Sequence, residues 1–390
     1  MRKYLPVLLI CLYPFTANAQ KDRISLSDSA VISLLTCDPV DDMAYTVYGH
    51  TAIRVKDSEN GIDFVYNYGM FDFSSPNFLY RFARGELNYF LGGCSFADFF
   101  REYYDRQSGI TEQTLNLTKE EKQKIFDTLL INYLPENRTY LYNFLFDNCS
   151  TRPRILFEKN ISGTIEYPEI LPQTTFRTIV HRCNKNHRWL TFGIDLALGA
   201  PLDSQIGQEP QLFIPEYLMQ AFGKAKTIMP DGTVRNLVVE TRKLAPTCPL
   251  ADKPLDSNPT VILWLFFVLV LLISVLELRF KKYFRTVDFI MLVAYGLTGC
   301  MIFFLSFISI HPAVFPNYSI IWAHPLLLVL AVLLLFKPLE RFVKYCMLVN
   351  GIILLLFMAG WKLFPQQFNP AFFPLVLALC TRSLIKFFRK

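Results

Sequence analysis

The residue with the clearest capacity for chemistry is Cys149, in the segment Phe146-Asp-Asn-Cys-Ser-Thr-Arg-Pro-Arg154. An aromatic run over residues 140–146 predicts a strand before it. Asn148 or Asp147 as a cap and Pro153 in the first turn predict a helix directly after it. A cysteine at a helix N-terminus has its thiolate favoured by the helix dipole. We therefore predict that Cys149 is a nucleophile. The alternative is a buried thiol or one half of a disulfide.

A thiolate nucleophile needs a base, and His50 is the candidate because it lies in a strand-like segment. Residues 48–55 and 62–68 predict two strands of an antiparallel hairpin, with the turn centred near Ser58 and Glu59. This register places His50 opposite Asn67 or its neighbour. Asn67 is predicted to fix the imidazole tautomer, and Asp72 is the alternative.

The other polar candidates have simpler interpretations. Arg152 and Arg154 flank the cysteine and either bind a phosphate head group or form surface ion pairs. The remaining residues are interpreted as turn, capping or solvated groups: Asp195, Asp203, His181 and His187.

The elements that must position these residues form an α+β arrangement. A strand over residues 31–36 precedes the hairpin, and helices are expected after Ser95 and Thr118, each of which has an acidic residue three positions later. A further helix is expected over residues 213–222. The order is therefore a hairpin with histidine, two helices, a strand, and the cysteine at a helix start.

The last third of the chain is almost uninterrupted apolar sequence and predicts an all-α domain of five transmembrane helices. Each segment approaches the length that crosses about 30 Å of hydrocarbon. Basic residues cluster after the first and third segments and at the C-terminus, which places these ends in the cytoplasm. The predicted spans are 260–278, 287–308, 318–336, 342–361 and 371–388.

Residues 1–19 have the pattern of a secretory signal: a positive start, an apolar run and the small-residue motif Ala17-Asn-Ala19. The domain prediction is then a signal peptide at 1–19, a periplasmic catalytic domain at 20–250, a linker at 251–259 and the membrane domain at 260–390. Because much of the net charge of +6 lies beside apolar segments, it orients a membrane protein and does not indicate nucleic-acid binding.

Cysteine counting is compatible with a reactive thiol. The segment between the signal and the first span contains an odd number, so that in an oxidising compartment four can pair and leave one free; alternatively, several are reduced and buried. Neither the cysteines nor the histidines have the spacing of a zinc site, and no metal or other cofactor is expected. These cysteines are Cys37, Cys94, Cys149, Cys183 and Cys248.

The order of histidine first and cysteine second resembles the circularly permuted papain-like group. A more extensive resemblance is to the Lnb family of Bacteroidetes membrane proteins, in sequence and in domain layout. It is carried by Tyr48-Gly-His-Thr-Ala-Ile-Arg-Val55, Tyr66-Asn-Tyr-Gly-Met-Phe-Asp-Phe73, Pro135-Glu-Asn-Arg138, Asp147-Asn-Cys-Ser-Thr-Arg-Pro-Arg154 and Phe192-Gly-Ile-Asp-Leu-Ala-Leu-Gly199.

This resemblance implies a permuted papain-like cysteine domain and lipoprotein N-acylation, with His50 and Cys149 as the catalytic pair. The expected acyl donor is a phospholipid, and the expected acceptor is the N-terminal amine of a diacylglyceryl lipoprotein. Backbone N–H groups at the helix start, including that of Cys149, are expected to stabilise the oxyanion. The alternatives are a membrane-tethered cysteine peptidase or amidase acting on cell-wall peptide, and a non-enzymatic lipoprotein-binding subunit.

Overall fold

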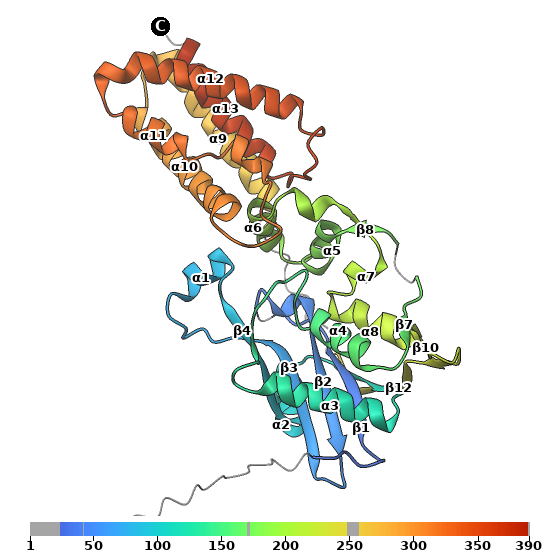
Figure 1. The fold of residues 1–390 in the computed structure, drawn as a ribbon. Coiled ribbons are helices and arrows are strands. Elements are labelled where there is room, and N and C mark those ends of the chain that lie inside the picture. Colours follow the sequence, from blue (N-terminus) through green and yellow to red (C-terminus); the bar gives the residue numbers. More distant parts are fainter. Residues whose placement is uncertain (1–23, 42, 170–171, 248–256, 389–390) are drawn as a thin grey trace, which may run out of the picture.

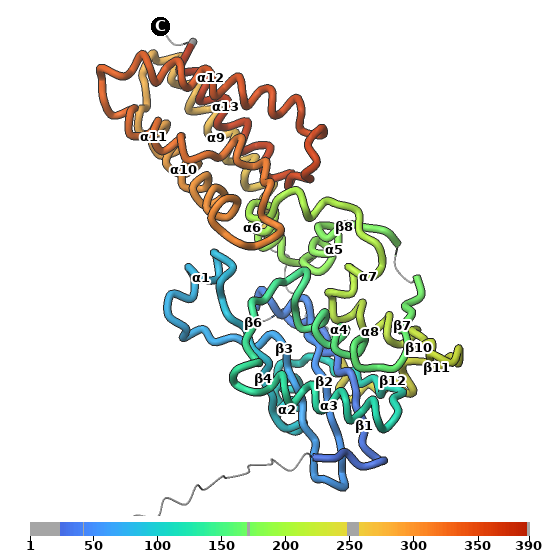
Figure 2. Tube along the Cα trace, in the orientation of Figure 1, coloured from blue at the N-terminus to red at the C-terminus, as the bar shows by residue number. Residues whose placement is uncertain are grey.

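The structure is a computed structural model that describes residues 24–41, 43–169, 172–247 and 257–388 (Figures 1 and 2). It contains a mixed α/β region followed by a helical region. The predicted signal peptide and most of the predicted linker lie outside the described residues.

The centre of the first region is a seven-stranded antiparallel sheet in the order β12-β5-β1-β2-β3-β4-β6. The predicted strands 31–36, 48–55 and 62–68 correspond to three neighbouring strands of this sheet. The bounds are β1 Val31–Cys37, β2 His50–Asp57, β3 Ile62–Met70, β4 Asn88–Ser95, β5 Ile110–Leu115, β6 Thr139–Leu141 and β12 Val238–Ala245.

The helices around this sheet begin where the capping patterns predict. Helix α2 (Phe96–Asp105) begins after Ser95, whose side chain accepts from the N–H of Asp98. Helix α3 (Lys119–Tyr133) has a capping box. The other helices are α1 Phe78–Arg84, α4 Thr151–Asn160, α5 Phe176–Cys183, α6 Arg188–Ala197, α7 Gln208–Gln211 and α8 Pro215–Lys224, with 3-10 turns η1 Thr46–Tyr48 and η2 Ala200–Asp203.

The strand predicted over residues 140–146 is wrong beyond its start, because β6 ends at Leu141. The chain turns instead: Asn143 and Asp147 form an isolated bridge, and the Asn143 side-chain oxygen accepts from the N–H groups of Leu145 and Phe146. An asparagine that bonds to backbone in this way favours a turn over a strand. Smaller sheets are formed by β7 Thr164–Glu166, β10 Lys226–Ile228 and β11 Val234–Asn236, and by β8 Thr174–Thr175 and β9 Gln205–Ile206.

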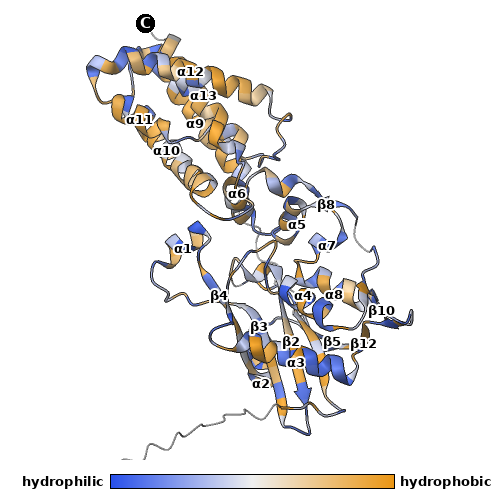
Figure 3. Ribbon diagram, viewed as in Figure 1, coloured by the Kyte–Doolittle hydropathy of each residue, from blue (hydrophilic) through white to orange (hydrophobic). Residues whose placement is uncertain are grey.

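In the helical region, three helices of the described residues are long and apolar enough to cross a membrane: Pro259–Phe280, Arg285–Phe307 and Lys337–Ala359. Figure 3 shows apolar residues along these helices. The third predicted span is broken into η3 (Tyr318–Ile321) and α11 (Leu326–Leu333), since Pro325 starts a new helix between them. The fifth, α13 (Phe372–Phe388), has 17 residues. The count of five spans is thus not confirmed. The remaining elements are α9 Pro259–Phe280, α10 Arg285–Phe307, η4 Lys337–Leu339 and α12 Glu340–Ala359.

The two regions meet where α6 approaches the loops of the helical region. The backbone N–H of Gly199 donates to Ala313 O at 2.9 Å, and that of Ala200 donates to Pro316 O at 2.8 Å. A Cβ atom on Gly199 would lie 2.2 Å from Pro316 O, so only glycine permits this approach. The ring of Phe192 also packs against Phe372 at 5.2 Å.

A buried ion-pair network lies behind this junction. Arg177 is fully buried and donates to Asp195 at 2.6 Å and to Asp203 at 2.8 Å. Asp195 also contacts His181 Nε2 at 2.8 Å and accepts from Asn369 of the helical region at 2.8 Å. The interpretation of Asp195 as a turn or capping residue is therefore wrong, because it lies inside α6 and is a counter-ion of a buried arginine. Asp203 does lie in the turn η2, and it is the second counter-ion.

Candidate active site

The loop that carries Cys149 is held by the side chain of Asn148, which is almost fully buried. Its Oδ1 accepts from the N–H groups of Ser150 and Thr151 at 2.8 and 2.9 Å, and so caps α4 as predicted. Its Nδ2 donates to the carbonyls of Phe144 and Phe213. Every hydrogen-bonding position of this amide is used in a single orientation, so the backbone around Cys149 is fixed before any substrate binds.

The start of α4 lies against β2, which carries His50. The hydroxyl groups of Thr51 and Ser150 are 3.0 Å apart, and these residues follow His50 and Cys149 in the chain. The backbone N–H of Thr51 is directed at the Cys149 sulfur. The structure thus brings together the two segments that the sequence predicts to carry the nucleophile and the base.

The surroundings of Cys149 differ from the expected thiolate environment. The residue is 9% exposed, and burial raises the pKa of its thiol, opposed by the N–H of Thr51, the side chain of Ser150 and its own N–H. Desolvation here outweighs the dipole of the helix start. The resting group is therefore a neutral thiol, and its proton must leave as the sulfur reacts.

His50 is held by the asparagine that the sequence predicts. Its Nε2 lies 3.2 Å from Asn67 Oδ1. Because that oxygen only accepts, Nε2 carries the proton and Nδ1 is left as a proton acceptor. Burial lowers the pKa of His50 to about 4, opposed by the bond to Asn67 and assisted by the positive charge of Arg106. The ring also stacks on Tyr103 at 6.0 Å.

The backbone before His50 needs a glycine. Gly49 has φ +76°, and a Cβ atom on it would lie 2.7 Å from Cys37 O. A side chain at this position would meet both the unfavourable φ and the neighbouring strand β1. Gly49 therefore lets the chain enter β2 with His50 as its first residue.

The predicted hairpin is confirmed, although its register differs by two residues. Ile53 pairs with Tyr66 and Asp57 pairs with Ile62, so the turn is centred one residue later than predicted. A shift of two residues keeps each side chain on its face of the sheet, and His50 therefore still reaches Asn67 diagonally. Asp72 is exposed and accepts from Ser74, so it does not orient His50.

The arginines beside Cys149 are engaged in ion pairs, as one of the two interpretations expects. Arg152 forms a bidentate pair with Asp147 at 2.6 and 2.7 Å and lies over the ring of Tyr140. Arg154 pairs with Glu158 at 3.0 Å and with Glu209 at 2.7 Å. These contacts brace the turn before Cys149 and the first turns of α4.

Sequence reasoning missed two tyrosines of the site and left the cysteine pairing open. Tyr103 stacks on His50. Tyr142 and Cys149 both lie against Gly69: a Cβ atom built there would be 3.5 Å from the Tyr142 ring and 3.6 Å from Cys149 Cβ, and burial raises the pKa of Tyr142. Nothing in the aromatic pattern of α2 separates Tyr103 from its neighbours. The described cysteines of the α/β region, Cys37, Cys94, Cys149 and Cys183, form no disulfide; Cys248 lies outside the described residues.

An aromatic arm, residues 71–85, extends from the site to the helical region (Figure 1). Tyr142 stacks on Tyr89 at 4.3 Å, and Tyr89 contacts Phe71 at 5.0 Å. In the arm itself, α1 has no buried residue, and Leu79 is 79% exposed. Aromatic side chains thus run continuously from Cys149 to the exposed helix α1, which presents apolar side chains beside two arginines.

The far end of the arm is anchored on the loop after α10. The N–H of Ile310 donates to Arg84 O at 2.9 Å, and His311 Nε2 donates to Phe82 O at 2.8 Å. Tyr80 also contacts Phe304 at 6.0 Å. The arm therefore lies at the end of the transmembrane helices that faces the sheet.

Taken together, the site offers a buried thiol, a neutral imidazole whose Nδ1 bonds to none of the described residues, and two backbone N–H groups near the sulfur. The N–H groups of Ser150 and Thr151 are already bonded to Asn148, so of the helix-start donors expected to bind an oxyanion only that of Cys149 remains open. Thr51 supplies the second. This set supports nucleophilic acyl chemistry with a general base.

Comparison with known proteins gives two matches to protein-family models. A model described as the Lnb N-terminal periplasmic domain matches residues 17–182, and one described as the Lnb transmembrane domain matches residues 252–390. No curated protein and no solved structure matches the chain.

Proposed function

The chain belongs to the Lnb family, and from this premise we propose that it is a lipoprotein N-acyltransferase. It is a membrane protein with a periplasmic domain ahead of its transmembrane domain. The proposed reaction moves an acyl chain from a phospholipid, through a thioester on Cys149, to the N-terminal amine of a diacylglyceryl lipoprotein. The observation that supports it most directly is the Asn67–His50 pair beside the buried helix start of Cys149.

In the first half-reaction, His50 Nδ1 takes the thiol proton as Cys149 Sγ attacks an ester carbonyl. The N–H groups of Thr51 and Cys149 stabilise the tetrahedral oxyanion. Collapse breaks the ester bond, His50 returns the proton to the departing lysophospholipid hydroxyl, and the acyl group remains as a thioester. Because the proton moves from Cys149 to His50 as the sulfur attacks, the mechanism can start from a neutral thiol and a neutral imidazole and needs no preformed ion pair.

In the second half-reaction, the neutral α-amine of the acceptor attacks the thioester. His50 accepts a proton from the amine and returns it to the sulfur, which leaves an amide and a regenerated thiol. Both substrates are embedded in the bilayer, so a tethered domain meets them at high local concentration. The basic loops and the C-terminus lie in the cytoplasm in this proposal, with the catalytic domain in the periplasm.

The alternative function is a membrane-tethered cysteine peptidase or amidase acting on cell-wall peptide. It uses the same dyad and differs in admitting water to the thioester. The aromatic arm favours the lipid substrate, because it connects the nucleophile to the membrane end of the molecule. A non-enzymatic lipoprotein-binding subunit is a further alternative. Thiol reagents do not distinguish it from an enzyme, because burial slows the reaction of Cys149 with such reagents in either case.

The test is intact mass spectrometry of the purified full-length protein incubated with phospholipid. We expect the wild type to carry an acyl adduct that hydroxylamine removes. We expect no hydroxylamine-labile adduct on Cys149→Ser. Addition of a diacylated lipopeptide should discharge the adduct into a triacylated product. Cleavage of a wall peptide with no acyl adduct from any lipid would replace this proposal with the peptidase.

Removal of the group that orients His50 should slow the reaction moderately. Asn67→Ala deletes one hydrogen bond to the imidazole, and a bond worth about 1.4 kcal/mol corresponds to roughly tenfold in rate. Single-turnover acylation measures this directly. Asn67→Asp keeps an acceptor and adds a charge, so it should raise the pKa of His50 and move the acidic limb of the pH profile upward. An unchanged limb would argue against contact between the two residues during turnover.

The aromatic arm should matter only for membrane-embedded substrate. Leu79→Gln removes an exposed apolar side chain whose transfer into lipid is worth about 2 kcal/mol, and we expect an acylation rate about thirtyfold lower with phospholipid vesicles. Monomeric short-chain phospholipid should react at the wild-type rate. Val239→Gln is the matched control, because Val239 is 65% exposed on β12 and away from the arm. Equal losses on vesicles and monomers would contradict this role.

A further inference from the structure

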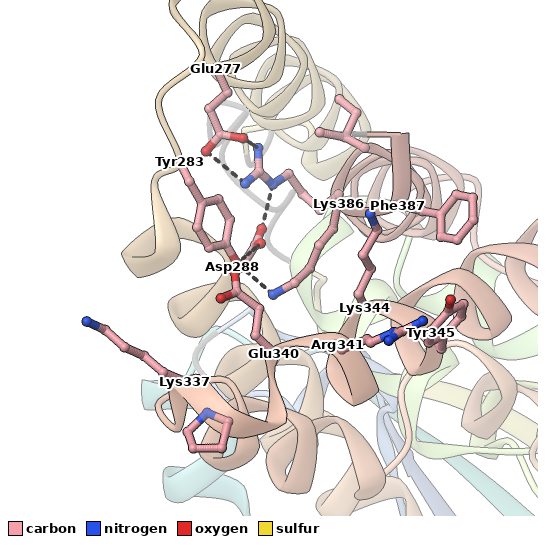
Figure 4. Close-up of a pocket in the computed structure, with 13 residues that line it drawn as sticks. Glu277, Tyr283, Asp288, Lys337, Glu340, Arg341, Lys344, Tyr345, Lys386 and Phe387 are labelled. Carbon is pink, nitrogen blue, oxygen red and sulfur yellow. Dashed lines mark hydrogen bonds and ion pairs between the residues drawn. The ribbon is translucent and has the colours of Figure 1, made fainter. Parts of the chain in front are cut away.

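A second candidate site lies at the end of the helical region farther from the sheet. It is a cavity of about 720 Å³ (Figure 4). The ends of α9 and α13, the start of α10 and the segment from η4 into α12 line it. Its lining is divided into a fully paired inner wall and a basic rim, and this division decides what it can bind.

The inner wall is an ion-pair network around Arg382, which is 2% exposed. The guanidinium donates to Glu277 at 2.8 and 3.0 Å and to Asp288 at 2.7 Å. Asp288 also accepts from Tyr283, and that phenol oxygen accepts from Lys386 at 2.8 Å. Two carboxylates therefore face two cations, and this wall is neutral and complete.

The rim is positive. Lys337, Arg341 and Lys344 of the η4–α12 segment line it, together with one carboxylate, that of Glu340 (Figure 4). Both Lys337 and Arg341 are exposed, and no acidic side chain among the described residues lies within ion-pair distance of either. The cavity as a whole thus has two positive charges in excess, and both unpaired cations are on its rim.

We propose that this cavity binds the phosphate of an anionic phospholipid headgroup. Basic pockets between transmembrane helices on the cytoplasmic side bind such groups, and a guanidinium matches phosphate oxygens in a bidentate geometry. Ile385 and Phe387 lie beside the rim and supply apolar surface for the glycerol and acyl chains. The site is separate from the donor site, because it lies at the opposite end of the transmembrane helices from the aromatic arm.

The neighbouring basic residues provide a matched comparison. Arg279 and Lys281 are exposed at the same end of the helices and do not line the cavity. Replacement of both by glutamine removes the same charge as Lys337→Gln/Arg341→Gln. If anionic lipid is only attracted generally to this end, both double variants should bind it equally weakly. If the cavity is a binding site, only Lys337→Gln/Arg341→Gln should weaken binding.

The experiment is thermal unfolding of the full-length protein in detergent, titrated with dioctanoyl phosphatidylglycerol, dioctanoyl phosphatidylcholine or inorganic phosphate. We expect phosphatidylglycerol to raise the melting temperature and phosphatidylcholine to leave it unchanged. Lys337→Gln/Arg341→Gln should weaken the apparent affinity at least tenfold (about 1.4 kcal/mol), and Arg279→Gln/Lys281→Gln should not. The unliganded melting temperature of each variant checks its fold.

Each other outcome decides against part of the proposal. Equal weakening in both double variants would replace the site with general electrostatic attraction. Saturation by inorganic phosphate at the same concentration as phosphatidylglycerol would keep an anion site and overturn its assignment to lipid. No stabilisation of the wild type by either anion would overturn the site altogether.

Discussion

Replacement of His50 by glutamine is expected to slow acylation of Cys149 by roughly 10³-fold, within the usual contribution of a general base. The effect should be large because burial keeps the thiol neutral, so that without a base very little nucleophile is present at neutral pH. Single-turnover formation of the hydroxylamine-labile adduct measures it. His187→Gln is the control, since His187 pairs with Asp41 at 2.5 Å in a separate cluster.

The pH dependence distinguishes a general base from a preformed ion pair. The pKa of His50 is lowered to about 4, so its neutral form, the proton acceptor, dominates above about pH 5 and is lost as the pH falls further. Wild-type acylation should therefore be level from about pH 5 to 7, while His50→Gln should gain about tenfold per pH unit as thiolate forms. A wild-type rate that rises about tenfold per pH unit through this interval and keeps rising above pH 7, as in the variant, would mean that His50 is not the base.

The positions of the catalytic candidates were predictable because local patterns determine them. Strand alternation and a turn gave the hairpin with His50 and Asn67, and capping chemistry around Asn148 gave the helix start at Cys149. The register error did not matter for the site, since an error of two residues preserves the face of a strand.

The protonation states and the junction of the two regions could not be predicted in the same way. The neutral state of Cys149 depends on burial by residues far apart in the sequence, and desolvation leaves no local pattern. Likewise, Arg177 pairs with aspartates 18 and 26 residues away. The third apolar segment has the composition of a span, but Pro325 divides it.

Arg177 gives the prediction with the largest expected effect on stability. Arg177→Met should destabilise the protein by about 3–5 kcal/mol, because it leaves the fully buried carboxylate of Asp195 without the guanidinium that pairs with it. Thermal or denaturant unfolding of the full-length protein measures this. Arg182→Met is the matched control: Arg182 lies on the same helix, is exposed and donates to the hydroxyl of Tyr217, and it should cost less than about 1 kcal/mol.

A double variant tests whether the unpaired charge is the cause. Asp195→Asn in the Arg177→Met background removes the uncompensated carboxylate and should recover part of the lost stability, whereas Asp195→Asn alone should destabilise the wild type. Because Asp195 also accepts from Asn369 of the helical region, the network joins the periplasmic domain to the membrane domain. Arg177→Met should therefore lower acylation from vesicles more than from monomeric lipid. Equal losses of acylation from vesicles and from monomeric lipid would mean that the network contributes to stability but does not place the site over the bilayer.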